Sequence, residues 1–239
     1  LSFSFLIVYI VRSYPRNRLI PYLLFFSISV TSLLGFTQTL TGTHAESTIP
    51  MFYGLSFYTA SLAYLASTQE KVSLAETWKV SNPLLLFTGP IALFVTKISH
   101  KSFRKRFSYF FPFIVIGIFY FQIVGAPLTR YLYLIDRTDL VSSLIFAMIF
   151  ELFVYSNFCG LSLLVYGIFG IAGYKIPLNF KQPFTSTNVL DFWKGWHTSL
   201  SAVLKKLFYT PLRSYLGWFG AIFAVYLASA MWHGVTLNF

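Results

Sequence analysis

Long apolar blocks separated by short basic loops constrain the fold of this chain more than any other feature. A helix needs about 20 mostly apolar residues to cross a bilayer. Blocks near this length cover 18–37, 50–67, 108–126, 141–158 and 216–232, with a shorter one at 1–11. Only 10% of the residues are charged, whereas a soluble domain carries about 25%. The sequence therefore predicts an all-α, polytopic transmembrane helical bundle, forming a single membrane domain over residues 1–239.

The distribution of charge indicates how the chain lies in the membrane. The net charge of +11 arises from 18 basic and 7 acidic residues, and most of the basic ones lie in short loops. This pattern places such loops in the cytoplasm and predicts a multi-pass membrane protein. No nucleic-acid-binding motif is present. Since the chain begins without Met and inside an apolar stretch, we expect it to be a piece of a longer protein.

Two apolar segments are less regular than the others. Segment 82–98 is interrupted by Gly89-Pro90, and both of its flanks favour the cytoplasm. We therefore predict a re-entrant segment that bends at Gly89-Pro90. Block 141–173 is too long for an ordinary span and has small, polar residues at its centre, 156–160. It is interpreted either as one helix followed by a membrane-embedded turn or as two short helices.

The stretch 188–208 has the period of an amphipathic helix. One face carries the apolar residues Trp193, Trp196, Leu200, Val203, Leu204 and Leu207. Asn188 suits the N-cap, and tryptophans favour the headgroup level of a bilayer. The pattern predicts an interfacial helix that carries His197 on its inward face, with Pro211 ending the helical region.

Two of the four histidines lie in apolar surroundings. His197 and His233 each follow a tryptophan, whereas His44 and His100 lie in polar loops. An ionisable residue at membrane depth is costly and marks a functional site by default. Neutral imidazole is also the usual general base for a hydroxyl. For His233, an interfacial Trp-His anchor is the alternative to a catalytic role.

Other kinds of site have little support in the sequence. The single cysteine, Cys159, excludes an internal disulfide. Two histidines with Glu151 match no metal-ligand spacing, so we expect no metal. Glu151 is the one acidic residue inside an apolar block, and we expect it to pair within the bundle.

Several motifs resemble those of the membrane-bound O-acyltransferase family, in its bacterial branch of alginate O-acetyltransferases and teichoic-acid D-alanyl transfer proteins. The motif FWKGWHTSLS covers 192–201. The segment PLNFKQPF at 177–184, which precedes it, resembles the family's LP-x-NF-x-x-P run. AMWHG at 230–234 resembles the second signature, and TGPI at 88–91 resembles "AGPI". The resemblance covers 82–239. It departs where the family has a basic pair before the first Trp-His, because this chain has Lys194-Gly195.

This resemblance implies a membrane-embedded O-acyltransferase. The enzyme would move an acyl group, expected to be acetyl, from a thioester donor to a hydroxyl of a cell-surface polysaccharide or related glycan. His233 and His197 are the implied catalytic residues. The implied substrate- or donor-binding residues are Asn179, Trp193, Lys194, Trp196, Ser199, Trp232 and Gly234.

The resemblance also implies partners. The donor would be acetyl-CoA, another acyl-CoA or an acyl carrier protein thioester, with no bound cofactor. The acceptor would be a glycan, and an accessory acyltransferase outside the membrane would complete transfer. Two other functions stay open: a non-catalytic transporter or export scaffold, and a lipid-directed acyltransferase of the same superfamily.

Overall fold

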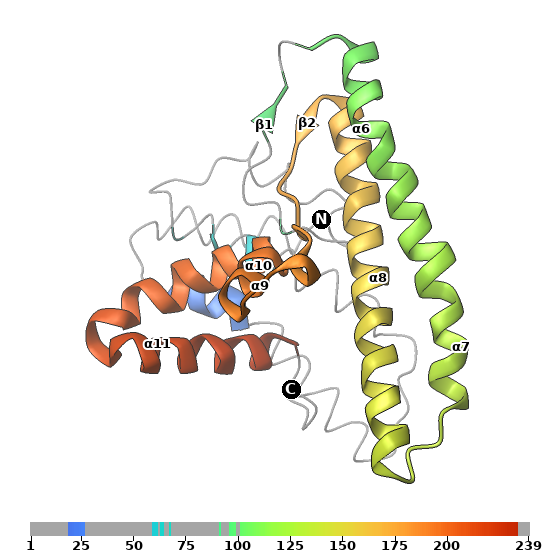
Figure 1. The fold of residues 1–239 in the computed structure, drawn as a ribbon. Helices are drawn as coiled ribbons and strands as arrows, with labels where there is room; N and C mark the ends of the chain where they lie inside the picture. Colours follow the sequence, from blue (N-terminus) through green and yellow to red (C-terminus); the bar gives the residue numbers. More distant parts are fainter. Residues whose placement is uncertain are drawn as a thin grey trace, which may run out of the picture. The chain divides into compact units, whose positions relative to one another are not determined.

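The structure, a computed structural model, describes residues 19–26, 59–61, 63–64, 67, 91, 96–98 and 101–233 (Figure 1). For Thr96 and His233 only the backbone is described. These residues are mainly helical, which confirms the predicted fold class. Three helical stretches are long and apolar enough to cross a membrane: Phe103–Leu134, Leu140–Ala172 and Thr198–Trp232. The predicted spans 1–11, 18–37 and 50–67 and the Gly89-Pro90 bend lie wholly or mostly outside the described residues.

The described residues group into two compact units by their contacts. One unit takes in 96–98 and 101–196, and we call it the hairpin unit. The other takes in 197–233 together with 19–26, 59–61, 63–64, 67 and 91, and we call it the histidine unit. Each is described separately below.

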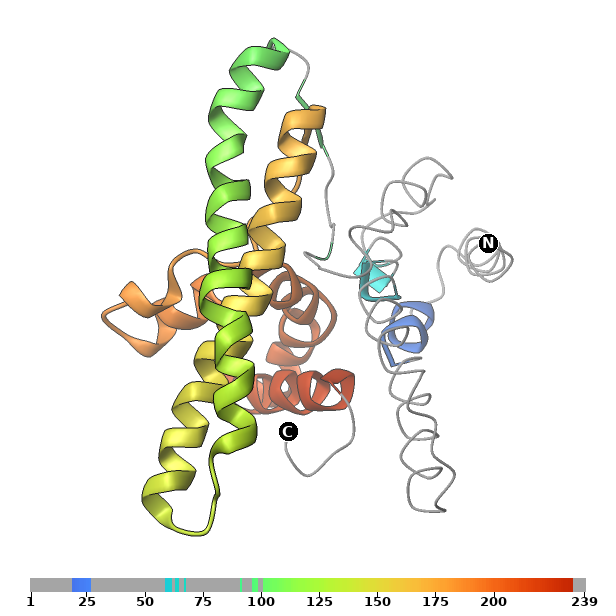
Figure 2. The same ribbon diagram turned by 90° about the vertical axis from the view of Figure 1, so that its right-hand side faces the viewer.

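A pair of long antiparallel helices forms most of the hairpin unit. The first arm consists of α6 (Phe103–Ile118), a π-helical turn η1 (Phe119–Gly125) and α7 (Ala126–Leu134). The second arm is α8 (Leu140–Ala172), which lies beside the first arm in both views (Figures 1 and 2). Large apolar side chains are exposed along both arms, among them Ile123 on the first and Leu144 and Met148 on the second. Such exposure is expected for helices that face lipid.

Helix α8 decides between the two interpretations of 141–173. It is one unbroken helix of 33 residues, so neither a membrane-embedded turn nor two short helices is correct. The small residues at its centre serve a close helix crossing instead. A Cβ built on Gly160 would lie 2.8 Å from the carbonyl oxygen of Gly117 on α6. Small residues allow two backbones to approach in this way.

Both ends of the helical hairpin are closed by local hydrogen bonds. At the N-terminus of α8, the Asp139 side chain accepts from the Ser142 backbone N–H at 2.9 Å. The Ser142 hydroxyl oxygen in turn accepts from the Asp139 backbone N–H, which completes a capping box. At its C-terminus, Gly173 has φ 97°, and the Arg106 guanidinium donates to the Ile171 carbonyl at 3.0 Å. Arg106 therefore satisfies one of the last carbonyl groups of α8.

Two short strands pair in the hairpin unit, one before α6 and the other directly after α8. Strand β1 (Thr96–Lys97) pairs antiparallel with β2 (Tyr174–Lys175). The end of the predicted re-entrant segment is therefore tied to the residues that follow α8. After β2 the chain forms a 3₁₀ turn η2 (Pro183–Thr185) and a short helix α9 (Val189–Gly195).

The histidine unit contains a second helical hairpin. Helix α10 (Thr198–Leu204), the π turn η3 (Lys205–Tyr209) and the first part of α11 (Thr210–His233) run on without a break. At Gly217, with φ 67° and ψ −177°, the helix is interrupted. The chain then turns back on itself (Figure 1). Side chains from both arms share one core with Phe25: Leu200, Val203, Leu204, Leu207, Phe208, Ala228 and Trp232.

The single interfacial helix predicted over 188–208 is wrong in two respects. It is broken between α9 and α10, because His197 adopts a left-handed conformation with φ 42°. It also continues past Pro211. Pro211 has no N–H to donate to the Leu207 carbonyl four residues earlier. The Tyr22 hydroxyl donates to that oxygen at 2.9 Å, and η3 precedes the proline, so the helix is not forced to end.

Candidate functional site

His197 begins α10 from a strained and buried position. Its backbone lies in the left-handed region, with φ 42° and ψ 54°. Histidine enters this region more readily than most residues with a Cβ, but the conformation still costs roughly 1–3 kcal/mol. The residue is only 5% exposed. Such strain, maintained by the surrounding structure, is typical of functional positions.

The imidazole of His197 caps its own helix. Its Nδ1 accepts a hydrogen bond from the Leu200 backbone N–H at 3.3 Å. That N–H is one of the first donors of a helix, which have no carbonyl partner within the helix. The bond therefore fixes the orientation of the ring and occupies the lone pair of Nδ1.

The helical hairpin of the histidine unit brings His197 and Trp232 together. The rings of His197 and Trp232 meet edge to face, with 6.4 Å between centroids and 81° between planes. Trp232 is 6% exposed and lies one residue before the end of α11 at His233. His197 of the first Trp-His pair therefore contacts Trp232 of the second. The side chain of His233 and all of Gly234 lie outside the described residues.

Ser199 has a structural partner that the sequence did not reveal. Its Oγ accepts from the Ile91 backbone N–H at 3.1 Å, and both residues are buried. Ile91 belongs to the TGPI segment. The hydroxyl that was predicted to bind substrate therefore ties Ile91 to the first turn of α10.

An aromatic cluster places Trp196 within the hairpin unit. Its ring stacks on Tyr155 of α8 and on Phe192 of α9, with 5.9 Å and 5.5 Å between ring centroids. It meets Phe180 edge to face, with 5.1 Å between ring centroids. Tyr155 also contacts Phe184 at 4.8 Å. Sequence reasoning missed Tyr155. A polar aromatic residue within the apolar block was the available signal.

Asn179 docks the segment before α9 onto the same helix. Its side-chain amide donates to the hydroxyl of Ser162 at 3.3 Å, and both side chains are buried. Asn179 was predicted to bind substrate or donor, and this bond shows that it also positions its own segment against α8. A buried amide needs such partners to offset its desolvation.

Gly195, at the position where the chain departs from the family's basic pair, lies close to the backbone of Lys181. The Lys181 backbone N–H donates to the Gly195 carbonyl at 2.9 Å. A Cβ on Gly195 would lie 3.0 Å from the Lys181 carbonyl oxygen. The backbone segments at Lys181 and Gly195 approach closely, so a larger residue at 195 would require one of the two segments to shift.

Lys194 and Trp193 lie on the exposed side of α9. Lys194 forms an ion pair with Asp191 at 2.7 Å, and Asp191 also accepts from the Asn188 amide at 2.8 Å. The hydrogen bond from Lys194, and then that from Asn188, lowers the pKa of Asp191 below its usual value. Trp193 is 43% exposed, so it does not share the buried face predicted for it with Trp196.

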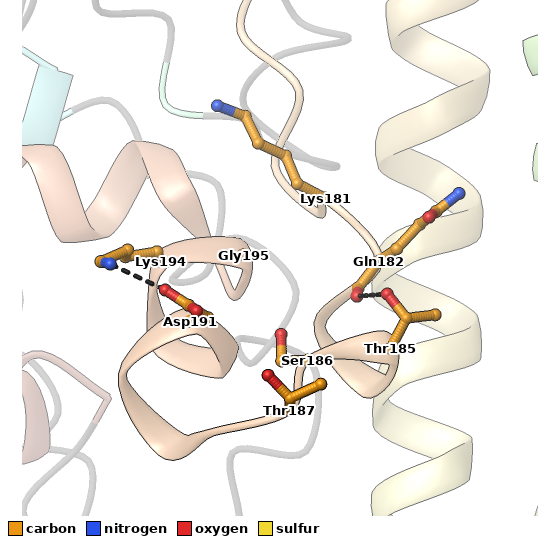
Figure 3. A pocket seen from close by; sticks show the side chains of 8 residues that line it. All are labelled: Lys181, Gln182, Thr185, Ser186, Thr187, Asp191, Lys194 and Gly195. Carbon is orange, nitrogen blue, oxygen red and sulfur yellow. Dashed lines mark hydrogen bonds and ion pairs between the residues drawn. The ribbon is translucent and has the colours of Figure 1, made fainter.

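A shallow polar recess of about 390 Å³ lies beside this ion pair (Figure 3). The residues that line it are Lys181, Gln182, Thr185, Ser186, Thr187, Asp191, Lys194 and Gly195. In Figure 3 the Lys181 side chain extends away from the hydroxyls of Ser186 and Thr187. The recess therefore has polar and charged walls but no converging set of cations.

The acidic residues make no metal centre in the part of the chain that is described. No group of three or more His, Cys, Asp or Glu side chains gathers there. Glu151, which we expected to pair within the bundle, instead has an exposed side chain on α8.

The sequence profile of the membrane-bound O-acyltransferase family matches residues 21–239. This chain belongs to that family. The match spans both units, from the helical stretch at 20–26 to the end of the second helical hairpin. The motif resemblance and the family match thus agree on the same assignment.

Three named bacterial proteins show how this family member compares with its relatives. A teichoic acid D-alanyltransferase of Bacillus subtilis is 26% identical over 51% of this chain and 35% of its own length. A probable alginate O-acetylase of Pseudomonas aeruginosa is 24% identical over 78% of this chain and 39% of its own. A peptidoglycan O-acetyltransferase of Helicobacter pylori is 33% identical over 36% of this chain and 17% of its own length. The chain thus spans well under half of each relative.

Proposed function

We propose that this chain is the histidine-bearing part of a membrane-embedded O-acyltransferase. The enzyme moves an acyl group, acetyl in the first instance, from a thioester donor to a hydroxyl of a cell-surface polysaccharide or related glycan. The names of the relatives support this, because each names an acyl transfer, and they name teichoic acid, peptidoglycan and alginate.

The observation that carries the proposal is the contact between His197 and Trp232. These residues are far apart in the sequence, and each belongs to a Trp-His pair. The turn at Gly217 returns the end of α11 to the start of α10, so that the two rings meet at 6.4 Å. One helical hairpin thereby brings one residue of each motif into contact.

The reaction assigned to this site is an acyl transfer in one displacement. The acceptor hydroxyl oxygen attacks the thioester carbonyl carbon, a C–O bond forms, and the C–S bond breaks. His233 takes the proton from the hydroxyl and delivers it to the departing thiolate. A positioned general base of this kind contributes roughly 10²–10⁴-fold in rate.

The donor and acceptor are expected on different sides of the membrane. The donor thioester, acetyl-CoA or an acyl carrier protein, would approach from the cytoplasm, and the glycan would lie outside. This arrangement places the whole protein in the plasma (inner) membrane as a multi-pass protein, with an accessory acyltransferase at the outer face. The predicted ligand-binding residues Asn179, Trp193, Lys194, Trp196, Ser199, Trp232 and Gly234 remain proposals for these roles.

The decisive experiment substitutes His233 in the full-length protein. Surface polymer from the His233→Ala strain is treated with mild base, and released acetate and D-alanine are both quantified alongside the level of membrane-inserted protein. Loss of one ester at a normal protein level supports the proposal and identifies the acyl group.

His100→Ala is the matched control, because it removes a histidine from a basic loop and is expected to leave the ester content unchanged. Unchanged ester content in the His233→Ala strain, at a normal protein level, would remove the catalytic assignment. Equal losses in both variants would point to a general effect of histidine removal and would also contradict it.

A further inference from the structure

We propose that the polar recess beside α9 lies inside the thickness of the membrane and is filled with water. Segment 176–196, which follows α8 and β2, re-enters the membrane beside the middle of α8 instead of lying at the headgroup level. The recess takes small polar molecules, not acyl chains. The inference does not rest on the proposed acyl transfer, because it uses only contacts within the hairpin unit.

Contacts with α8 fix how far along the helix this segment lies. The Asn179 amide donates to the Ser162 hydroxyl at 3.3 Å, and the ring of Trp196 stacks on Tyr155. Ser162 lies ten positions before Ala172, the last residue of α8, and Tyr155 lies seventeen positions before it. At a rise of 1.5 Å per residue, these levels are about 15 Å and about 25 Å from that end of the helix. Figure 1 accordingly shows α9 beside the middle of α8.

The outer surface of the first arm indicates that lipid surrounds the hairpin at these levels. Between Arg106 and Arg130 this arm has no charged residue, and many of its large apolar side chains are exposed. Ile123, close to the point where Gly125 approaches Asn157 of α8, is 63% exposed. A hydrocarbon core is about 30 Å thick. A core that begins just after the cations of α6 therefore includes both levels.

Segment 176–196 has the opposite character at the same depth. Its backbone is neither helix nor strand over 176–182, and the ion pair between Lys194 and Asp191 leaves 75% and 49% of the two side chains exposed. Charges and irregular backbone are stable at membrane depth only where protein buries them or where they line a water-filled cavity. These groups are exposed beside a recess of about 390 Å³, so we assign water to it.

The lining of the recess decides which molecules it suits. Hydroxyl groups come from Ser186 and Thr187, and charged groups come from Lys194 and Asp191 (Figure 3). An acyl chain would remove these groups from water without replacing their hydrogen bonds, which is costly. A molecule with hydroxyl or charged groups replaces those bonds as it enters. The recess thus gives such a molecule a place at membrane depth that does not require contact with hydrocarbon.

Spin labels on the full-length protein in bilayer discs test this inference. A label at Thr187→Cys reports on the recess, and a label at Ile123→Cys is the matched control on the lipid-facing side of the hairpin. Oxygen concentrates in hydrocarbon, whereas a water-soluble nickel chelate stays in water, so collisions with each identify the surroundings of a label. Cys159 is buried, and wild-type protein treated in the same way gives the background.

We expect collisions with the nickel chelate to be several-fold more frequent at Thr187 than at Ile123, and collisions with oxygen to dominate at Ile123. Lys181→Cys, at a second residue that lines the recess, should behave like Thr187→Cys and replaces it if that variant does not fold.

Two results would overturn the inference. Frequent nickel collisions at Ile123 would place this level of the hairpin outside the hydrocarbon. Rare nickel collisions at both Thr187 and Lys181 would show that protein, not water, fills the recess. Neither result depends on acyl transfer, so the proposed function is tested separately by the His233→Ala strain.

Discussion

Gly117 and Gly160 lie against each other where α6 crosses α8. A Cβ on Gly117 would lie 2.7 Å from the Gly160 carbonyl oxygen, and one on Gly160 would lie 2.8 Å from the Gly117 carbonyl oxygen. Neither position has room for a side chain, because the opposing atoms belong to the backbone. In lipid, where the hydrophobic effect does not hold helices together, such close packing is a main source of association.

Gly160→Ala is therefore expected to destabilise the helical hairpin. The added methyl group must push the two backbones apart, and overpacking of this kind costs about 1–3 kcal/mol. Thermal unfolding of the full-length protein in bilayer discs measures the effect. Ala147→Val adds methyl groups to an exposed position of the same helix and should change the midpoint little. Equal midpoints for the Gly160→Ala variant and the wild type would contradict the crossing.

Gly217→Ala tests the turn that joins the two Trp-His motifs. With φ 67° and ψ −177°, Gly217 lies in a region that essentially only glycine adopts, at a cost of about 1–3 kcal/mol for other residues. No atom lies within 4 Å of a Cβ built there, so the whole effect comes from the backbone. We expect a lower thermal midpoint and reduced acyl transfer.

Ser214→Ala is the control for the Gly217 variant. Ser214 lies at an exposed position of α11, before Gly217, and this variant should behave as the wild type. If Gly217→Ala retained full activity and stability, the turn would not be what holds His197 and Trp232 together.

Tyr22 and Pro211 are expected to be coupled in stability. Tyr22→Phe removes the donor to the Leu207 carbonyl and should cost about 0.5–1.5 kcal/mol. In a Pro211→Ala background the restored N–H can serve the same carbonyl, so the Tyr22→Phe effect should shrink. A double-mutant cycle on the full-length protein measures the coupling. Tyr215→Phe, at a side chain 85% exposed, is the matched control. Additive effects of the two changes would disprove the relationship.

Asp139 is expected to make α8 sensitive to acid. The Ser142 backbone N–H, and then the Ser142 hydroxyl, lowers the pKa of Asp139 below its usual value of 3.8. A carboxyl whose folded pKa is lowered stabilises the fold above its unfolded pKa, and this contribution disappears as the pH falls through the folded pKa.

The measurement compares Asp139→Asn with the wild type by hydrogen exchange of the first turn of α8 between about pH 3 and about pH 6. Asparagine can still cap the helix but does not titrate over this range. The wild type should gain protection relative to the variant as the pH rises, after correction for intrinsic exchange. A constant difference across this range would show that the carboxylate does not contribute through its charge.

Local composition was enough to predict membrane helices and to single out the candidate histidines. Apolar length indicated the spans that became the two arms of the first hairpin, because burial of apolar surface in lipid depends on composition and length. Asp139 and Gly173 are helix-ending residue types at the ends of α8. The Trp-His pairs at 196–197 and 232–233 were identified because histidines in apolar surroundings are rare. These are properties of neighbouring residues along the chain.

Tertiary structure decided what the same residue types do. Small residues in 156–160 predicted a turn, but the passage of α6 at Gly117 makes them a crossing point. Pro211 predicted a helix end, but Tyr22, almost two hundred residues away in the sequence, supplies the missing donor.

The sequence by itself thus determined that the chain is a helical membrane protein with two candidate histidines. The tertiary structure decided that the helix breaks at His197 rather than at Pro211, and that the chain reverses at Gly217 so that His197 meets Trp232. The physical reason is that hydropathy and capping act between near neighbours. A left-handed backbone, a donor from a distant helix and the return of one arm onto another depend on contacts that form only in the folded chain.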